Sequence, residues 1–205
     1  MNETLATETS VSRETRARLE QFVALVRKWS PAINLVSGKD LPILWDRHVV
    51  DSLQLWQAVP IAGGRWVDLG SGGGFPGAVV AIMAQDRAPG LSVTLVESDQ
   101  RKAAFLRTVS RETGCAFSVI AERAETIPPL QADVLSARAL APLERLLDHA
   151  ERHLAPSGVA IFPKGARHQH ERTEAQRRWF FSWDVLPSLT DDRAVVYRIR
   201  KVERV

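Results

Sequence analysis

A glycine-rich segment, VDLGSGGGFPG, spans residues 67–77 and constrains the fold more than any other part of the sequence. Five of its eleven residues are glycine, a short apolar run precedes it, and an acid, Asp68, lies just before the glycines. A strand that enters a glycine-rich turn is typical of doubly wound α/β domains that hold a nucleotide-like cofactor. The segment therefore predicts such a domain, with a cofactor that carries either phosphates or a positive charge.

Apolar segments after this loop alternate with helical or crossover segments, as expected for a parallel sheet buried on both faces. Strands are predicted at residues 65–69, 92–98, 117–121, 133–137 and 158–162. The last two apolar segments, 183–189 and 194–202, flank a turn around Asp191 and Asp192 and predict an antiparallel hairpin. We therefore expect a Rossmann-like α/β fold, a mostly parallel doubly wound sheet with a C-terminal antiparallel hairpin.

Residues 1–60 predict an N-terminal helical extension, followed by the main domain at 61–205. One helix is expected over Ser12–Trp29, capped by its first residue and ended by Pro31, because the residue before a proline avoids helical angles. A second helix is expected at about Pro42–Gln57, from its apolar residues at helical spacing.

Composition limits the class of protein and the cellular compartment that can be expected. An apolar content of 45% with 25% charged residues is ordinary for a soluble globular protein. Cys115 is the single cysteine, which excludes an intramolecular disulfide and a cysteine-based zinc site and favours a reducing compartment. The first residues are polar, unlike a secretory signal, and the densest apolar stretch, 77–84, is too short to span a bilayer. We therefore expect a cytoplasmic protein without membrane association.

Positive charge gathers toward the C-terminus, although the net charge is only +3. Residues 164–205 hold ten Lys/Arg against six Asp/Glu. Such a stretch is compatible with binding along a nucleic-acid backbone, and equally with a solvated protein face.

The string GGGFPG at 72–77 matches the dinucleotide pattern G-x-G-x-x-G, but two features disfavour a diphosphate. Pro76 has no amide hydrogen to donate, and Asp68 would place negative charge beside the phosphates. Both features favour S-adenosylmethionine, which carries an ammonium and a sulfonium. Glu97 ends the next strand, about 20 residues beyond the loop, where an acid meets ribose hydroxyls. The predicted cofactor motif is Asp68-x-Gly70-x-Gly72-x-Gly74, and an NAD-dependent oxidoreductase is the alternative.

Seven short motifs between about Trp29 and Gly165 form an ordered set: INLVS, HVVDSL, DLGSGGGFPG, KAAFL, ERAE, SARAL and FPKG. With them the chain resembles the RsmG (GidB) family of bacterial ribosomal RNA methyltransferases, which act on N7 of a guanine in the decoding-region loop of 16S rRNA. The resemblance implies a class I methyltransferase fold, S-adenosyl-L-methionine as cofactor, and 16S rRNA or the small ribosomal subunit as partner. A non-catalytic RNA-binding or ribosome-assembly module remains an alternative.

The resemblance also implies roles at matching positions. The implied cofactor-binding residues are Gly70, Phe75, Glu97, Ser98, Asp99, Ala124, Glu125 and Arg138. The upstream motifs would close the pocket with Asn34, His48, Asp51 and Ser52. Val36 stands where the family more often has threonine, a departure that bears on Asn34 and Ser37.

No residue is assigned as a catalytic acid or base, because guanine N7 presents a lone pair in the neutral base. Arg138, Lys164 and His48 are candidates for positioning the substrate, and Lys164 would hold a phosphate or a guanine O6. A buried His48 satisfied by Asp51 is an equal interpretation. The target base is expected in a single-stranded or splayed loop.

His149 and His153 have the spacing of two metal ligands on a helix, but no further ligand cluster completes a site. We therefore expect a surface histidine pair, no metal, and a monomer. The six tryptophans mostly lie on apolar stripes and are predicted to be core residues.

Overall fold

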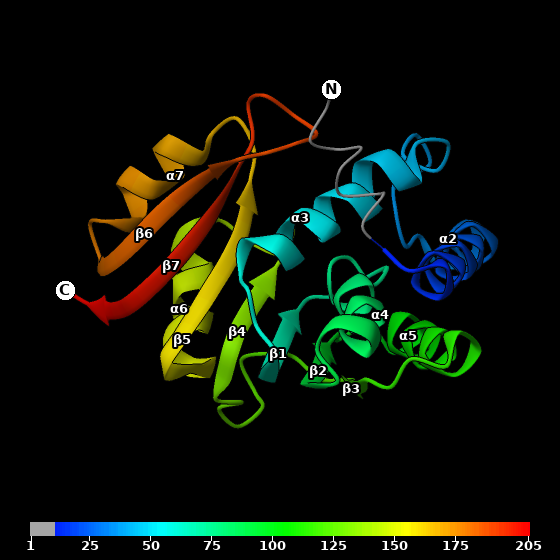
Figure 1. Cartoon of the computed structure of the whole chain (residues 1–205). Helices are drawn as coiled ribbons and strands as arrows, with labels where there is room; N and C mark the ends of the chain where they lie inside the picture. Colours follow the sequence, from blue (N-terminus) through cyan, green and yellow to red (C-terminus); the bar gives the residue numbers. More distant parts are fainter. Residues whose placement is uncertain (1–10) are drawn as a thin grey trace.

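The centre of the computed structural model, which describes residues 11–205, is a seven-stranded sheet in the order β3-β2-β1-β4-β5-β7-β6 (Figure 1). The strands are β1 (Gly63–Leu69), β2 (Gly90–Val96), β3 (Ser118–Ile120), β4 (Ala132–Ala137), β5 (Leu154–Lys164), β6 (Trp179–Pro187) and β7 (Val195–Arg204). Strands β1 to β5 pair in parallel, whereas β7 is antiparallel to both β5 and β6. This confirms the predicted parallel sheet with a C-terminal hairpin.

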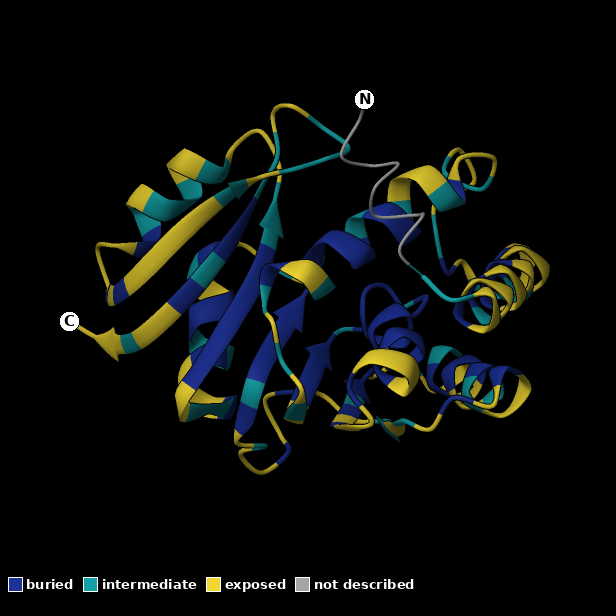
Figure 2. Ribbon diagram, in the orientation of Figure 1, coloured by how far each residue is buried: buried dark blue, intermediate teal, exposed yellow. Residues whose placement is uncertain are grey.

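Helices cover both faces of the sheet, so its central strands are buried over much of their length (Figure 2). The helices are α2 (Arg13–Ile33), α3 (Val50–Ala58), α4 (Gly77–Arg87), α5 (Gln100–Thr113), α6 (Leu143–His153) and α7 (His168–Ala175). Helices α2 to α5 share one hydrophobic cluster with the sheet, and α6 and α7 lie with a second cluster on the other face. Side chains of β1 alternate between the two, with Trp66 in the first cluster and Val67 and Leu69 in the second.

Helix α2 begins as predicted but extends further. The Ser12 hydroxyl accepts a hydrogen bond from the Thr15 amide at 3.1 Å, which confirms the N-cap. The expectation that Pro31 ends the helix is wrong, because α2 continues to Ile33 and ends at Asn34, whose φ is 48°. The proline lies in the last turn, where its missing amide removes a single bond, and the Asn34 amide still donates to the Ser30 carbonyl at 2.9 Å.

The second helical segment begins later than predicted. A five-residue π-helix, η1 (Trp45–Val49), comes first and continues directly into α3. Neither segment forms a separate core, because residues of α2, η1 and α3 belong to the hydrophobic cluster that also holds α4. No helix within residues 11–205 is long and apolar enough to cross a membrane.

Candidate functional site

The glycine loop connects β1 to α4 at the carboxyl ends of the parallel strands, where ligands bind in open α/β sheets. Gly70, Gly72 and Gly74 have φ values of 64°, 51° and 90°, a backbone conformation that favours glycine. A side chain at Gly74 would also meet the Phe22 ring, whose nearest atom lies 3.1 Å from the position of a Cβ. Helix α2 therefore packs directly on the loop.

Most amide hydrogens of this loop are already used within the protein. The amides of Gly70, Ser71, Gly72, Gly74 and Gly77 all donate to carbonyl or carboxylate oxygens of the chain. A diphosphate needs amide donors that point at it, and Pro76 at the start of α4 has none to offer. The loop thus fits a ligand that presents positive charge and no phosphate, which is the chemistry of S-adenosylmethionine.

Asp68 lies beneath the loop and is fully buried. Its carboxylate accepts hydrogen bonds from the Ser136 hydroxyl at 2.7 Å and from the Gly77 amide at 3.3 Å. The Trp66 indole donates to the same hydroxyl at 2.9 Å, so that a buried chain of hydrogen bonds crosses from β1 to β4. Burial raises the pKa of Asp68 to about 6, which leaves it ionised at neutral pH. Ser136 and Trp66 were not predicted to take part in the site.

Glu97 joins the ends of β1 and β2. One carboxylate oxygen accepts the Gly72 amide and the other accepts the Asp99 amide, both at 2.8 Å. Asp99 in turn caps α5 by accepting the Arg101 and Lys102 amides, and hydrogen bonds from Arg101 lower its pKa to about 2. The two acids therefore build the rim on which ribose hydroxyls were predicted to rest.

A narrow cavity of about 80 Å³ lies on the far side of this rim. It brings together four of the predicted cofactor residues: Gly70, Ser98, Ala124 and Glu125. Leu140 also lines it and covers the loop, because a Cβ at Gly70 would lie 2.6 Å from the Leu140 Cδ1 atom. Leu140 was not predicted to line the site, although it ends the SARAL motif.

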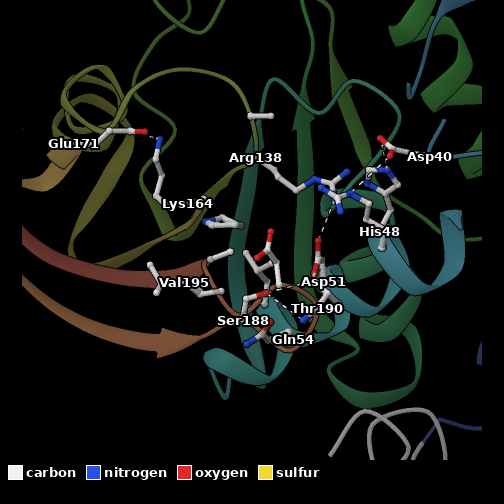
Figure 3. A pocket seen from close by; sticks show the side chains of 18 residues that line it. Asp40, His48, Asp51, Gln54, Arg138, Lys164, Glu171, Ser188, Thr190 and Val195 are labelled. Atoms are coloured by element: carbon white, nitrogen blue, oxygen red, sulfur yellow. Dashed lines mark hydrogen bonds and ion pairs between the residues drawn. The ribbon is translucent and has the colours of Figure 1, made fainter. Parts of the chain in front are cut away.

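A larger cavity of about 400 Å³ (Figure 3) is connected with the glycine loop through Arg138 in its wall, which lies over the Phe75 ring. The β4–α6 connection, the end of β5, the η1–α3 segment and the β6–β7 turn all line it. This cavity brings together His48, Asp51, Arg138 and Lys164. His48 and Lys164 were predicted to position the substrate, Asp51 to close the pocket, and Arg138 to bind the cofactor or position the substrate.

Arg138 connects this large cavity with the glycine loop. Its guanidinium carbon lies 5.3 Å from the centre of the Phe75 ring, and its Nη1 atom lies 3.8 Å from Oδ2 of Asp51. The Phe75 ring is buried and also contacts the rings of Phe22 and His48, at 4.9 and 5.1 Å between centroids. The arginine is therefore held over the loop with its charge facing the cavity.

His48 lies beside Asp40, so the alternative interpretation, in which Asp51 satisfies it, is wrong. Its Nε2 atom lies 3.6 Å from Oδ2 of Asp40, and neither ring nitrogen makes a hydrogen bond within the described part of the chain. Burial, assisted by Arg138, lowers the pKa of His48 to about 4, so the imidazole is neutral at pH 7.

Two other residues of the upstream motifs have structural positions. Ser52 is buried and donates to the His48 carbonyl at 2.7 Å. Asn34 is the exposed C-cap of α2 and lines neither of the two cavities, but Leu35 after it packs on the loop, with its carbonyl 3.0 Å from the position of a Cβ at Gly73.

Lys164 has partners within the protein. Its ammonium lies 2.6 Å from the Glu171 carboxylate and donates to the Ala141 carbonyl at 3.1 Å. Glu171 also accepts the Leu143 amide at the start of α6, at 2.9 Å. The pair therefore braces the segment that follows Arg138. Glu171 was not predicted, because α7 carries no motif that connects it with β5.

The two histidines of α6 do not form a surface pair, and this expectation was wrong. His153 is fully buried, with Nε2 2.9 Å from the Ala124 carbonyl, and its ring stacks on that of His149. Residues 11–205 contain no group of three or more His, Cys, Asp or Glu side chains that could hold a metal ion.

Many arginines of the basic C-terminal stretch are engaged in ion pairs. Arg178 pairs with Glu144 at 2.6 Å, Arg204 with Asp148 at 2.7 Å, and Arg198 with Asp184 at 2.9 Å. Acids from α6 and β6 therefore offset much of the charge that the sequence alone places there. Trp183 is an exception to the predicted core tryptophans, since it is 38% exposed on β6.

Known proteins resemble the chain in both sequence and fold. Residues 15–194 match the family model GidB, described as rRNA small subunit methyltransferase G. Proteins named ribosomal RNA small subunit methyltransferase G from Ruegeria sp. (strain TM1040) and Ruegeria pomeroyi are 51% and 53% identical, and each alignment covers at least 96% of both chains. The fold matches a crystal structure of a mutant of MtNAS in complex with S-adenosylmethionine, with a TM-score of 0.61 and 18% identity over 92% of this chain and 76% of that one.

Proposed function

Because the chain belongs to the rRNA small subunit methyltransferase G (GidB) family, we propose that it transfers a methyl group from S-adenosylmethionine to N7 of a guanine in the decoding-region loop of 16S rRNA. One observation carries the proposal beyond family membership. An acid-flanked glycine loop, with most of its amides already used, lies beside a cavity large enough for one extruded base.

Different residues around the loop bind different parts of the methyl donor. When bound, S-adenosylmethionine supplies an electrophilic methyl group on a positively charged sulfur. Glu97 accepts from the ribose hydroxyls, and the narrow cavity between Ser98 and Ala124 takes the adenine. The buried charge of Asp68 attracts the ammonium through a weakly screening interior.

The proposed reaction needs no residue of the large cavity to remove a proton from the substrate. Guanine N7 carries a lone pair in the neutral base, so alignment and electrostatics suffice for the rate. His48 is neutral at pH 7 and its ring packs on the Phe75 ring, a position that suits packing against a base better than proton transfer. Arg138 lies between the two halves and aligns them.

The function is tested by methyl transfer to small ribosomal subunits from cells that lack this gene. With tritiated S-adenosylmethionine, we expect one methyl group per subunit, and mass spectrometry of the digested rRNA is expected to find 7-methylguanosine in the decoding-region loop. Cofactor binding without transfer would favour a non-catalytic RNA-binding module.

The pKa of Asp68 predicts how the affinity for the methyl donor varies with pH. A cationic ligand favours the ionised carboxylate, so protonation of Asp68 competes with binding below pH 6. Calorimetry between pH 5 and 8 is expected to find constant affinity above about pH 6.5 and a loss of about tenfold per pH unit below the pKa. An affinity that is constant down to pH 5 would contradict the electrostatic role of Asp68.

A further inference from the structure

Four carboxylates line the large cavity, and two of them are occupied by hydrogen-bonding partners of the protein. Glu171 binds Lys164, and Asp191 accepts both the amide and the guanidinium of Arg193. Asp40 lies 3.8 Å from Arg47 and 3.6 Å from His48, and both distances are too long for a hydrogen bond. Glu171 and Asp191 are therefore committed to holding the walls of the cavity.

Asp51 is the fourth acid, and it differs from Asp40 because a hydrogen bond holds its carboxylate in one orientation. Among the described residues it accepts one hydrogen bond, from the Thr190 hydroxyl to Oδ1. Its Oδ2 atom lies 3.8 Å from Arg138, which is too far for a hydrogen bond. The carboxylate therefore retains free acceptor sites, and Figure 3 shows it next to the guanidinium in the cavity.

The orientation of Asp51 is fixed by contacts between α3 and the β6–β7 turn. Gln54, one helical turn further along α3, donates to the Pro187 carbonyl at 2.6 Å and accepts the Leu189 amide at 3.1 Å. These two bonds dock the turn on the helix and place Thr190 against Asp51. A carboxylate held in one orientation but incompletely bonded is suited to recognise a ligand with N–H donors.

We propose that Asp51 recognises the Watson–Crick edge of the target guanine, accepting hydrogen bonds from N1–H and from the N2 amino group. This inference rests on the proposed function. Guanine presents these two donors side by side, which matches the two lone-pair directions of one carboxylate, whereas adenine has an acceptor at N1. Enzymes that extrude a base read it through this edge.

Arg138 completes the recognition. The O6 atom of guanine lies between N1 and N7 on the rim of the base, and it accepts hydrogen bonds. A guanine bound to Asp51 through N1 and N2 therefore turns O6 toward the neighbouring guanidinium, and N7 toward the glycine loop on which that guanidinium lies. The other bases do not present this sequence of groups.

The same contact favours the reaction itself. Methylation at N7 makes the base cationic, and N1–H becomes a stronger donor as that charge develops. Hydrogen bonds to an ionised acceptor strengthen with the charge of the donor, so Asp51 binds the transition state more tightly than the ground state.

The test compares small subunits reconstituted with 16S rRNA that carries guanosine or inosine at the target position. Inosine keeps N1–H, O6 and N7 but lacks the N2 amino group. The wild type is expected to prefer guanosine by about tenfold or more in kcat/KM, the usual effect of one hydrogen bond to a charged group. Asp51→Asn is expected to lower kcat/KM on guanosine by about tenfold or more and to bring the guanosine/inosine ratio close to one.

Calorimetric affinity of Asp51→Asn for S-adenosylmethionine is expected to stay within about twofold of the wild type, which separates base recognition from loss of the fold. The matched control is Asp192→Asn on the same turn, whose side chain is 96% exposed and whose ratio is expected to equal that of the wild type. Thr190→Val keeps the Asp51 carboxylate but removes the hydrogen bond to it, so the guanosine/inosine ratio is expected to fall partly. Thr190→Ser keeps the hydroxyl and is expected to restore the ratio.

The inference would be overturned if Asp51→Asn kept the guanosine/inosine ratio of the wild type. It would also be overturned if the wild-type protein methylated guanosine and inosine subunits equally well. In both cases the proposed function would still stand. No transfer to guanosine by the wild type would overturn both. Should Asp51→Asn fail to fold, the two Thr190 variants decide by the same ratio.

Discussion

Asp68→Asn is expected to raise the dissociation constant for S-adenosylmethionine by about 100-fold or more, because loss of one member of a buried charge pair costs about 3–5 kcal/mol. The substitution removes the charge beneath the glycine loop. It also turns an amide nitrogen toward either the Ser136 hydroxyl or the Gly77 amide, both of which donate to the carboxylate. One buried donor is then left without an acceptor, which costs about 1–3 kcal/mol of unfolding free energy and is offset by the removal of a buried charge whose pKa is raised by burial.

Isothermal calorimetry with S-adenosylmethionine and with S-adenosylhomocysteine measures this loss, which is expected to be similar for the two because both carry the ammonium. The matched control is Asp133→Asn. Asp133 accepts the Arg65 amide at the opposite end of β1, and its side chain is 40% exposed, so cofactor affinity is expected to be unchanged. A dissociation constant for Asp68→Asn within about threefold of the wild type, a difference of about 0.7 kcal/mol, would contradict the assignment of Asp68.

The strand pattern could be predicted from sequence because each central strand is a short apolar run between turn residues. The two helix errors arose where local rules meet tertiary contacts. Proline disfavours the interior of a helix, but Pro31 lies in the last turn of α2, where its energetic cost is small. The π-helix η1 could not be predicted from residue propensities. It contains His48, whose ring contacts that of Phe75.

That the predicted cofactor residues lie near one another could be foreseen, because they follow the ends of successive strands. In a parallel sheet these ends meet at one edge, which brings Gly70, Ser98 and Ala124 together. Burial was not readable, so the hydrogen bonds that join Asp68 with Ser136 and Trp66 could not be foreseen.

The arrangement of the residues that line the large cavity could be predicted only in part. Asp51 and Thr190 are 139 residues apart in sequence, and their contact depends on how the hairpin turn docks on α3. The Lys164–Glu171 pair likewise depends on the placement of α7 against the end of β5. Motifs identify such residues one by one, whereas the packing of distant elements decides which of them meet.

Gly77→Ala is expected to destabilise the protein, opposite to the usual effect of replacing a helical glycine by alanine, which stabilises by about 1 kcal/mol. A Cβ at this position would lie 2.8 Å from Oδ2 and 2.9 Å from Cβ of Asp68, and 2.9 Å from Cγ of Leu95. Neither neighbour is free to move, because Asp68 is held by Ser136 and Leu95 is fully buried in β2. Helix α4 must therefore shift away from the sheet.

Overpacking of this kind costs about 1–3 kcal/mol, and in a chain of this size each kcal/mol lowers the melting temperature by about 2–4 °C. Thermal unfolding is therefore expected to occur roughly 2–12 °C lower in Gly77→Ala. Affinity for the methyl donor is expected to fall at the same time, since the shift displaces the Asp68 carboxylate from the Gly77 amide. Gly38→Ala is the control, because nothing lies within 4 Å of its Cβ position. A melting temperature for Gly77→Ala equal to or above that of the wild type would mean that the site tolerates a side chain, and that contact between α4 and β1 does not hold the buried acid in place.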